Sequence, residues 1–220
     1  KEKAIETNKK YSEMLGIPQS TAITCVKPSG TVSQLVDSAS GIHTRHSDYY
    51  IRTVRGDNKD PLTQFMKESS IPNEPDVMKP DSTTVFSFPM KSPKGATTRN
   101  DMSAIDQLRL WQTYQKYWCE HKPSVTISVK EDEWMEVGAW VYKNFDAISG
   151  ISFLPHSDHT YAQAPYQEIG KKEYETLKNK MPKSIDWKLL QNYEKEDNTA
   201  GSKELACSAG VCEVVDIQST

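Results

Sequence analysis

The segment with the clearest fold signal is Thr21-Ala-Ile-Thr-Cys-Val-Lys-Pro-Ser-Gly-Thr-Val-Ser-Gln34. Its first half, Ala22–Val26, mixes β-branched and small apolar residues, which predicts a short buried strand. Pro28 ends this strand because proline has no N–H group to donate to a β-ladder. A sharp turn follows, and a helix is expected to begin at Val32.

The turn in this segment has the features of an anion site. A strand that breaks at Pro-Ser-Gly and enters a helix leaves several backbone N–H groups available at the helix N-terminus. The hydroxyls of Ser29 and Thr31 flank them, and Gly30 allows a ligand to approach the backbone closely. Phosphate is the usual occupant of such a site. The alternative is an ordinary N-capped helix in which Ser29 or Thr31 satisfies its own backbone.

The longer stretch Lys27-Pro-Ser-Gly-Thr-Val-Ser-Gln-Leu-Val-Asp-Ser-Ala-Ser-Gly-Ile-His43, followed by Tyr49-Tyr-Ile-Arg-Thr-Val-Arg55, resembles the catalytic barrel of ribonucleotide reductases. It is most similar to the adenosylcobalamin-dependent (class II) branch, as is the later Gln163-Ala-Pro-Tyr166. In that family the Pro-Ser-Gly-Thr segment holds the phosphates of the substrate ribonucleotide. The resemblance implies the same role for Ser29, Gly30, Thr31 and Val32, with Pro28 and His43 close to the substrate.

Composition excludes several classes of protein. The chain has 220 residues, enough for one large domain with or without a tail, and a net charge of −3 with no basic block typical of a nucleic-acid surface. No apolar stretch approaches about 18 residues, so no membrane span is expected, and no signal peptide is visible. Four cysteines in this pattern favour the reducing cytoplasm. Because the chain begins with Lys1, we expect a processed chain, a split subunit or an excerpt of a longer protein.

The fold class expected from the pattern is α/β. Strands are predicted to begin at Ala22, Tyr49, Thr83, Pro123 and Ile148, and the clearest helices cover 103–118 and 131–145. Parallel pairing is favoured because the connections hold helices. The resemblance implies that these five or so mainly parallel strands, with crossover helices, form the second half of a ten-stranded α/β barrel. The predicted domains are this half-barrel over 1–165, short surface helices over 166–193, and a flexible linker with a cysteine tail over 194–220.

Two groups of histidines could in principle bind a metal. His43 and His46 are three residues apart, and His156, Asp158 and His159 form a second cluster. Neither group has further Cys, Asp or Glu residues at ligand spacing, and both lie in predicted loops. No metal site is therefore predicted.

The chain ends with a cysteine pair behind a polar linker. Cys207 and Cys212 have four residues between them, all small or flexible, so a disulfide can close at little cost. An exposed pair of this kind suits thiol–disulfide exchange. Half of a zinc site is the alternative, but Cys25 and Cys119 lie in or beside predicted core elements and supply no second pair. The resemblance implies a tail that re-reduces an active-site disulfide and is itself reduced by thioredoxin or glutaredoxin.

The resemblance thus implies the C-terminal portion of a ribonucleotide reductase, acting on ribonucleoside di- or triphosphates by thiyl-radical chemistry. An N-terminal half or subunit would carry the radical cysteine and most of the adenosylcobalamin site, and no nucleic acid or membrane partner is expected. One alternative is a class I large-subunit fragment that uses a metal-radical subunit, although Tyr161 and Tyr166 are not the adjacent tyrosine pair expected near its tail. The other is a non-catalytic nucleotide-binding or redox module.

Overall fold

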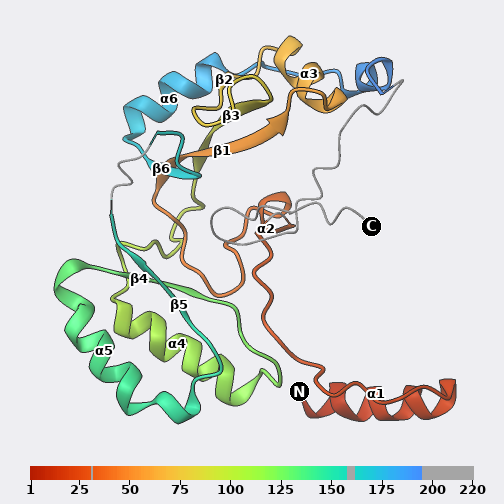
Figure 1. The fold of residues 1–220 in the computed structure, drawn as a ribbon, viewed down its shortest axis with the longest axis vertical. Coiled ribbons are helices and arrows are strands. Elements are labelled where there is room, and N and C mark those ends of the chain that lie inside the picture. The colour runs from red at the N-terminus through yellow and green to blue at the C-terminus, as the bar shows by residue number, and fades with distance from the viewer. Residues whose placement is uncertain (31, 158–161, 195–220) are drawn as a thin grey trace, which may run out of the picture. The chain divides into compact units, whose positions relative to one another are not determined.

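The computed structural model describes residues 1–30, 32–157 and 162–194, and the chain divides into two compact units (Figure 1). Unit 1 comprises Lys1–Arg45 and Pro93–Ser157. Unit 2 comprises His46–Ser92 and the described residues from 162 onward. Each unit is therefore assembled from two segments that are far apart in the sequence. No helix in the described part of the chain is long and apolar enough to cross a membrane.

Unit 1 contains a strand–helix–strand motif that the sequence predicted. Strands β4 (Thr126–Val129) and β5 (Ser152–Pro155) pair in parallel, with Thr126 opposite Ser152. Three helical segments connect them, namely η1 (Glu131–Glu133), α5 (Trp134–Lys143) and η2 (Phe145–Ala147). Parallel pairing is confirmed for these two strands, because a crossover helix returns the chain to the end of the sheet where β4 began.

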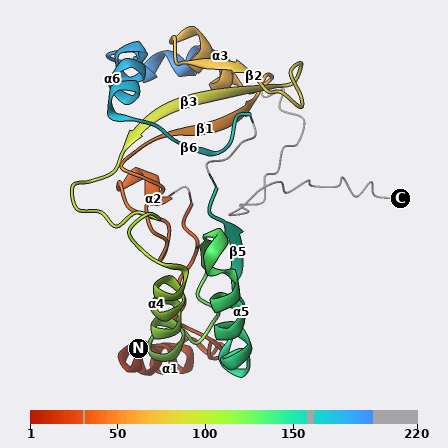
Figure 2. The same cartoon turned by 90° about the vertical axis from the view of Figure 1, so that its left-hand side faces the viewer.

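The core of unit 1 lies between this motif and helix α4 (Ala104–Tyr117), which packs against β4 and α5 (Figure 2). Leu108 and Ile127 are fully buried there, and each contributes about 1.5–3 kcal/mol by leaving water. Trp111 is 1% exposed, and its indole Nε1–H donates to the carbonyl of Pro123 at 3.1 Å. Ser103 caps the N-terminus of α4, since its Oγ accepts from the backbone N–H of Asp106 at 3.1 Å.

The N-terminal part of unit 1 differs from the prediction. Helix α1 (Glu2–Leu15) ends at Gly16, and the helix expected from Val32 is the single turn α2 (Val32–Leu35). The predicted strand over residues 22–26 is wrong, because this segment is irregular. Its carbonyls accept backbone hydrogen bonds from residues 120–124, which are also irregular, so no β-ladder forms.

Unit 2 is built on an antiparallel sheet in the order β2-β3-β1-β6. Its strands are β1 (Tyr49–Asp57), β2 (Asn73–Pro75), β3 (Thr83–Lys91) and β6 (Tyr166–Glu168). Parallel pairing of β1 and β3 was predicted and is wrong. Tyr49 lies opposite Lys91 and Asp57 opposite Thr83, so the connection through α3 (Pro61–Glu68) returns the chain to the end of the sheet where β1 stops.

Two further helices complete unit 2. Helix α6 (Lys171–Lys180) packs against β1 and β3, and the 3-10 helix η3 (Trp187–Asn192) packs against α3. Phe65 of α3 contacts the rings of Trp187 and Tyr193 at centroid distances of 5.4 and 5.5 Å. Both helices were predicted from the sequence, whereas the short strand β6 was not.

The described residues therefore form a mixed α/β structure, as predicted, with one parallel strand pair and one antiparallel sheet. The expectation of about five mainly parallel strands is wrong for these residues, because the four-stranded sheet is antiparallel throughout. The ten-stranded barrel and the predicted domain limits at residues 165 and 193 stay predictions.

Candidate functional site

The predicted phosphate loop, residues 28–32, is held in unit 1 by contacts with the segment that follows α2. Ser29 has a φ of 44°, in the left-handed region. Its Oγ accepts a hydrogen bond from the N–H of Gly41 at 3.1 Å, and its carbonyl accepts from the N–H of Ser33 at 3.0 Å. The Ser29 hydroxyl oxygen thus accepts a hydrogen bond from the 37–43 loop, and its proton remains available for donation to another group.

Gly41 makes this contact possible. Its φ is 53°, and a Cβ at this position would lie 2.8 Å from the carbonyl oxygen of Lys27 and 3.2 Å from Cγ1 of Val26. Only glycine combines this backbone conformation with so close an approach. By contrast, a Cβ on Gly30 would meet nothing within 4 Å, so the space beside the loop is open.

His43 fixes the position of the 37–43 loop relative to strand β4. Its Nε2 accepts from the backbone N–H of Thr126 at 2.9 Å, while Nδ1 lies 2.6 Å from the carbonyl oxygen of Ser40. These partners assign the neutral tautomer with the proton on Nδ1. Both ring nitrogens serve the protein backbone, so His43 positions the loop and does not offer a nitrogen to a ligand.

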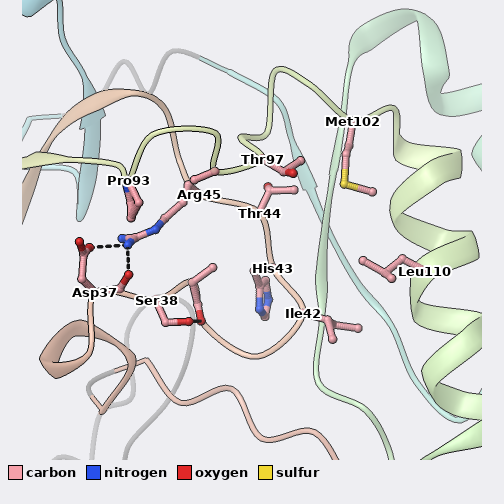
Figure 3. A pocket seen from close by; sticks show the side chains of 12 residues that line it. Asp37, Ser38, Ile42, His43, Thr44, Arg45, Pro93, Thr97, Met102 and Leu110 are labelled. Atoms are coloured by element: carbon pink, nitrogen blue, oxygen red, sulfur yellow. Dashed lines mark hydrogen bonds and ion pairs between the residues drawn. The ribbon is translucent and has the colours of Figure 1, made fainter.

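A pocket of about 350 Å³ lies beside the same loop (Figure 3). Residues of the 37–45 and 93–110 segments line it, namely Asp37, Ser38, Ala39, Ile42, His43, Thr44, Arg45, Pro93, Ala96, Thr97, Met102 and Leu110. Figure 3 shows the Arg45 side chain extending toward Asp37, and Met102 above Leu110 on the opposite side. The pocket is therefore apolar on one wall and charged on another.

The charged wall is an ion pair between a buried cation and a more exposed carboxylate. The Arg45 side chain is 5% exposed and that of Asp37 is 61% exposed. The guanidinium donates to the Asp37 carboxylate and, at 2.5 Å, to the carbonyl oxygen of Asp37. Backbone hydrogen bonds between Arg45 and its neighbours Thr97 and Arg99, each 2.9 Å long, hold this residue in place. The pair neutralises the buried charge, as burial requires.

The Gln163-Ala-Pro-Tyr166 motif has a structural role in unit 2. Gln163 has a φ of 58°, and its side-chain amide donates to Glu74 at 2.9 Å and to the carbonyl of Pro75 at 2.8 Å. Its Oε1 accepts from the N–H of Val77 at 2.9 Å. The motif therefore fastens the segment before β6 to the edge strand β2.

Asp76 supports the same region as a buried carboxylate, with a side chain that is 5% exposed. Burial alone would raise its pKa, but hydrogen bonds from Arg55 and from the backbone N–H groups of Met78 and Lys79 outweigh that effect. The pKa of Asp76 is therefore held below its usual value. This carboxylate could not be identified from the sequence, because its partners are backbone groups and Arg55, which is 21 positions away.

Several predicted site residues cannot be placed. Thr31, Cys207 and Cys212 lie outside the described residues, as do Asp158 and His159. Among the residues that the structure describes, no group of three or more His, Cys, Asp or Glu side chains could hold a metal ion. The structure brings Ser29 together with Gly41, a residue that was not among the predicted site residues.

Comparison with known proteins gives consistent matches along the chain. A protein of Dictyostelium discoideum described as a probable adenosylcobalamin-dependent ribonucleoside-triphosphate reductase is 33% identical over 220 residues, covering 97% of this chain and 28% of the relative. A crystal structure of a B-12 dependent (class II) ribonucleotide reductase matches with a TM-score of 0.71 and 26% identity, covering 86% of this chain and 26% of the other. This chain is homologous to the class II ribonucleotide reductases. No family model matches it.

Two further adenosylcobalamin-dependent ribonucleoside-triphosphate reductases extend this homology. The Euglena gracilis enzyme is 32% identical over 79% of this chain, and the Lactobacillus gasseri enzyme is 28% identical over 96% of it. The chain spans 24% and 29% of these two reductases, respectively, and so less than a third of each relative's length. All three of these relatives carry the adenosylcobalamin-dependent name.

Proposed function

We propose that this chain is the C-terminal portion of an adenosylcobalamin-dependent ribonucleoside-triphosphate reductase. The complete oxidoreductase would convert ribonucleotides to 2′-deoxyribonucleotides by thiyl-radical chemistry. The observation that carries this proposal is the homology to such reductases along 97% of the chain. The triphosphate substrate follows from the names of the relatives. Assembly of the chain into half of a ten-stranded barrel is part of the same proposal.

Within that enzyme, residues Ser29–Val32 would bind the substrate phosphates. The support is local geometry, since the Ser29 hydroxyl retains its proton while Gly41 orients it at 3.1 Å. The space beside Gly30 is open to a ligand, and Val32 is 65% exposed at the start of α2. Hydroxyl and backbone N–H groups are suitable donors to phosphate oxygens. His43 would act indirectly, by holding the 37–43 loop against β4.

The cofactor does not fit the pocket of unit 1. Small-molecule sites span about 300–1,000 Å³, and the pocket of about 350 Å³ is at the lower end of that range. A corrinoid ring with its nucleotide loop and adenosyl group is too large for it. Adenosylcobalamin supplies the radical in such enzymes, and we assign its binding to the part of the reductase that this chain does not span.

The tail thiols Cys207 and Cys212 would re-reduce the active-site disulfide after each turnover, with thioredoxin or glutaredoxin as the external reductant. The support is their spacing, with four small or flexible residues between them. We expect Cys207→Ser and Cys212→Ser to abolish turnover driven by thioredoxin and to spare turnover driven by a small dithiol. Equal loss with both reductants would contradict the shuttle role. The cysteine usage also supports a reducing, cytoplasmic location.

The decisive experiment measures reduction of ribonucleoside triphosphates by this chain assembled with its native upstream portion. One sample contains adenosylcobalamin, a second contains a metal-radical subunit instead, and a control contains neither. Deoxyribonucleotide product is quantified by chromatography. Product that depends on cobalamin supports the proposal. Product that appears only with a metal-radical subunit would assign the chain to class I. No product from a folded assembly under either condition would refute the reductase proposal.

A further inference from the structure

Two free cysteines of unit 1 lie on neighbouring segments of the chain. Cys25 belongs to the irregular segment before the phosphate loop and is partly exposed. Cys119 follows the residue that caps α4 and is 7% exposed. The proposed reductase function uses neither thiol, because it assigns thiol exchange to the tail.

Backbone hydrogen bonds hold these two segments together on both sides of Cys25. The carbonyl of Thr24 accepts from the N–H of Glu120 at 2.8 Å, and the carbonyl of Val26 accepts from the N–H of Ser124 at 2.9 Å. The carbonyl of Cys25 itself accepts from the indole N–H of Trp118 at 3.2 Å. Cys25 is therefore bonded to the residue immediately before Cys119, and Thr24 to the residue immediately after it.

This bonding limits the separation of the two cysteines. The Thr24 carbonyl belongs to the peptide group that leads into Cys25, and the Glu120 amide belongs to the peptide group that leaves Cys119. Standard covalent geometry together with the 2.8 Å hydrogen bond keeps the two Cα atoms within about 8 Å. Disulfides span Cα separations of about 4.4–6.8 Å. At most a small movement of the irregular segment is needed to reach that range.

The environments of the two thiols differ. Burial raises the pKa of the Cys119 thiol, and the neighbouring Cys25 raises it further, while the N–H of Val26 and the charge of Lys1 act in the opposite direction. Cys119 is therefore a protonated thiol at neutral pH. Cys25 is the more exposed of the two sulfurs, so an oxidant in solution reaches it first.

We propose that Cys25 and Cys119 are a redox modification site that hydrogen peroxide converts to an intramolecular disulfide. The Cys25 thiol releases its proton, the resulting thiolate attacks one peroxide oxygen and the O–O bond breaks. Cys25 becomes a sulfenic acid, and the other oxygen leaves as hydroxide and takes up the released proton to form water. The Cys119 sulfur then attacks the Cys25 sulfur, the S–O bond breaks, and the second water leaves with the Cys119 proton. Two thiols are oxidised and one peroxide is reduced to two waters. This inference does not depend on the reductase function.

The experiment uses the full 220-residue chain with Cys207→Ser and Cys212→Ser, which leaves Cys25 and Cys119 as the only thiols among the original four. After treatment with hydrogen peroxide, remaining thiols are alkylated under denaturing conditions and the chain is digested with trypsin. Because trypsin does not cleave before proline, the two cysteines lie in peptides 11–45 and 117–130. We expect these peptides to be linked with the loss of two hydrogens, and dithiothreitol to separate them.

Single substitutions in the same background provide matched controls. The Cys119→Ser variant should still be oxidised at Cys25 but should yield no linked peptide. In the Cys25→Ser variant, Cys119 should be oxidised at least tenfold more slowly than Cys25 is in the Cys119→Ser variant. A linked peptide in a monomer on a non-reducing gel supports the proposal. Recovery of both thiols in reduced form, oxidation of Cys25 to sulfinic acid without linkage, or linkage only between two chains would overturn it.

Discussion

Replacement of Gly41 by alanine tests how the phosphate loop is held. The φ of 53° places an alanine in the left-handed region, at a cost of about 1–2 kcal/mol. The added Cβ would lie 2.8 Å from the Lys27 carbonyl and 3.2 Å from Val26, and such overpacking costs about 1–3 kcal/mol. We therefore expect Gly41→Ala to lower the free energy of unfolding by about 2–5 kcal/mol.

Urea unfolding monitored by tryptophan fluorescence measures this loss, because Trp111 is 1% exposed in the core of the same unit. Two other glycines of unit 1 separate the contributions. Gly95 has a φ of 79° but open space around it, so Gly95→Ala should cost only the backbone term of about 1–2 kcal/mol. Gly30 has open space and no left-handed φ, so Gly30→Ala should be neutral or stabilising by less than about 1 kcal/mol.

The comparison of these variants can refute the reasoning directly. If Gly41→Ala costs no more than Gly95→Ala, the close approach to the Lys27 carbonyl does not constrain the loop. If Gly30→Ala costs as much as Gly41→Ala, the space beside the phosphate loop is not open in solution. A large loss for Gly41→Ala alone would confirm that the 37–43 loop and the 26–29 segment are held in close contact.

Three further predictions concern single side chains. Ser29→Ala should raise the KM for the triphosphate about tenfold in the assembled reductase, because one hydrogen bond to a charged group is lost. Gln163→Ala removes three side-chain hydrogen bonds of 2.8–2.9 Å and should destabilise the chain by about 2–4 kcal/mol in urea unfolding. Gln163→Gly should be less harmful, since glycine accepts the φ of 58°. The lowered pKa of Asp76 stabilises the fold at neutral pH, and this contribution should disappear as the pH falls below the ordinary value of 3.8. The stability difference between wild type and Asp76→Asn should therefore narrow on acidification, and a constant difference would contradict the assignment.

The sequence predicted best those elements whose partners are close in the chain. The β4–α5–β5 motif was predicted correctly because both strands and their crossover helix lie between Thr126 and Pro155. Over so short a stretch, the local pattern of apolar residues indicates which strands pair. The antiparallel direction of β3 relative to β1 was not predicted. A helix in the connection favours parallel pairing only when it returns the chain to the end of the sheet at which the first strand began. Helix α3 has 8 residues and does not do so.

Contacts between distant residues could not be read from the sequence. Residues 22–26 have the composition of a strand, yet their hydrogen-bond partners at 120–124 are irregular, so strand propensity was overridden by tertiary context. The close approach of Gly41 to the Lys27 carbonyl was also not evident from the sequence. Similarly, His43 was identified as a loop histidine, while its partner Thr126 is 83 positions away.

The interleaving of the two units has a consequence for biosynthesis. Unit 1 needs residues on both sides of His46–Ser92, so its N-terminal segment leaves the ribosome well before its packing partners exist. The hydrogen bond from Thr126 to His43 cannot form until strand β4 has been translated, so the segment that contains His43 is synthesised early and reaches its final position only later. During this interval the loop is exposed to proteases and chaperones. A chain that stops before Pro93 contains every residue of the phosphate loop but lacks the second segment of unit 1. We therefore expect such a truncated chain to be degraded.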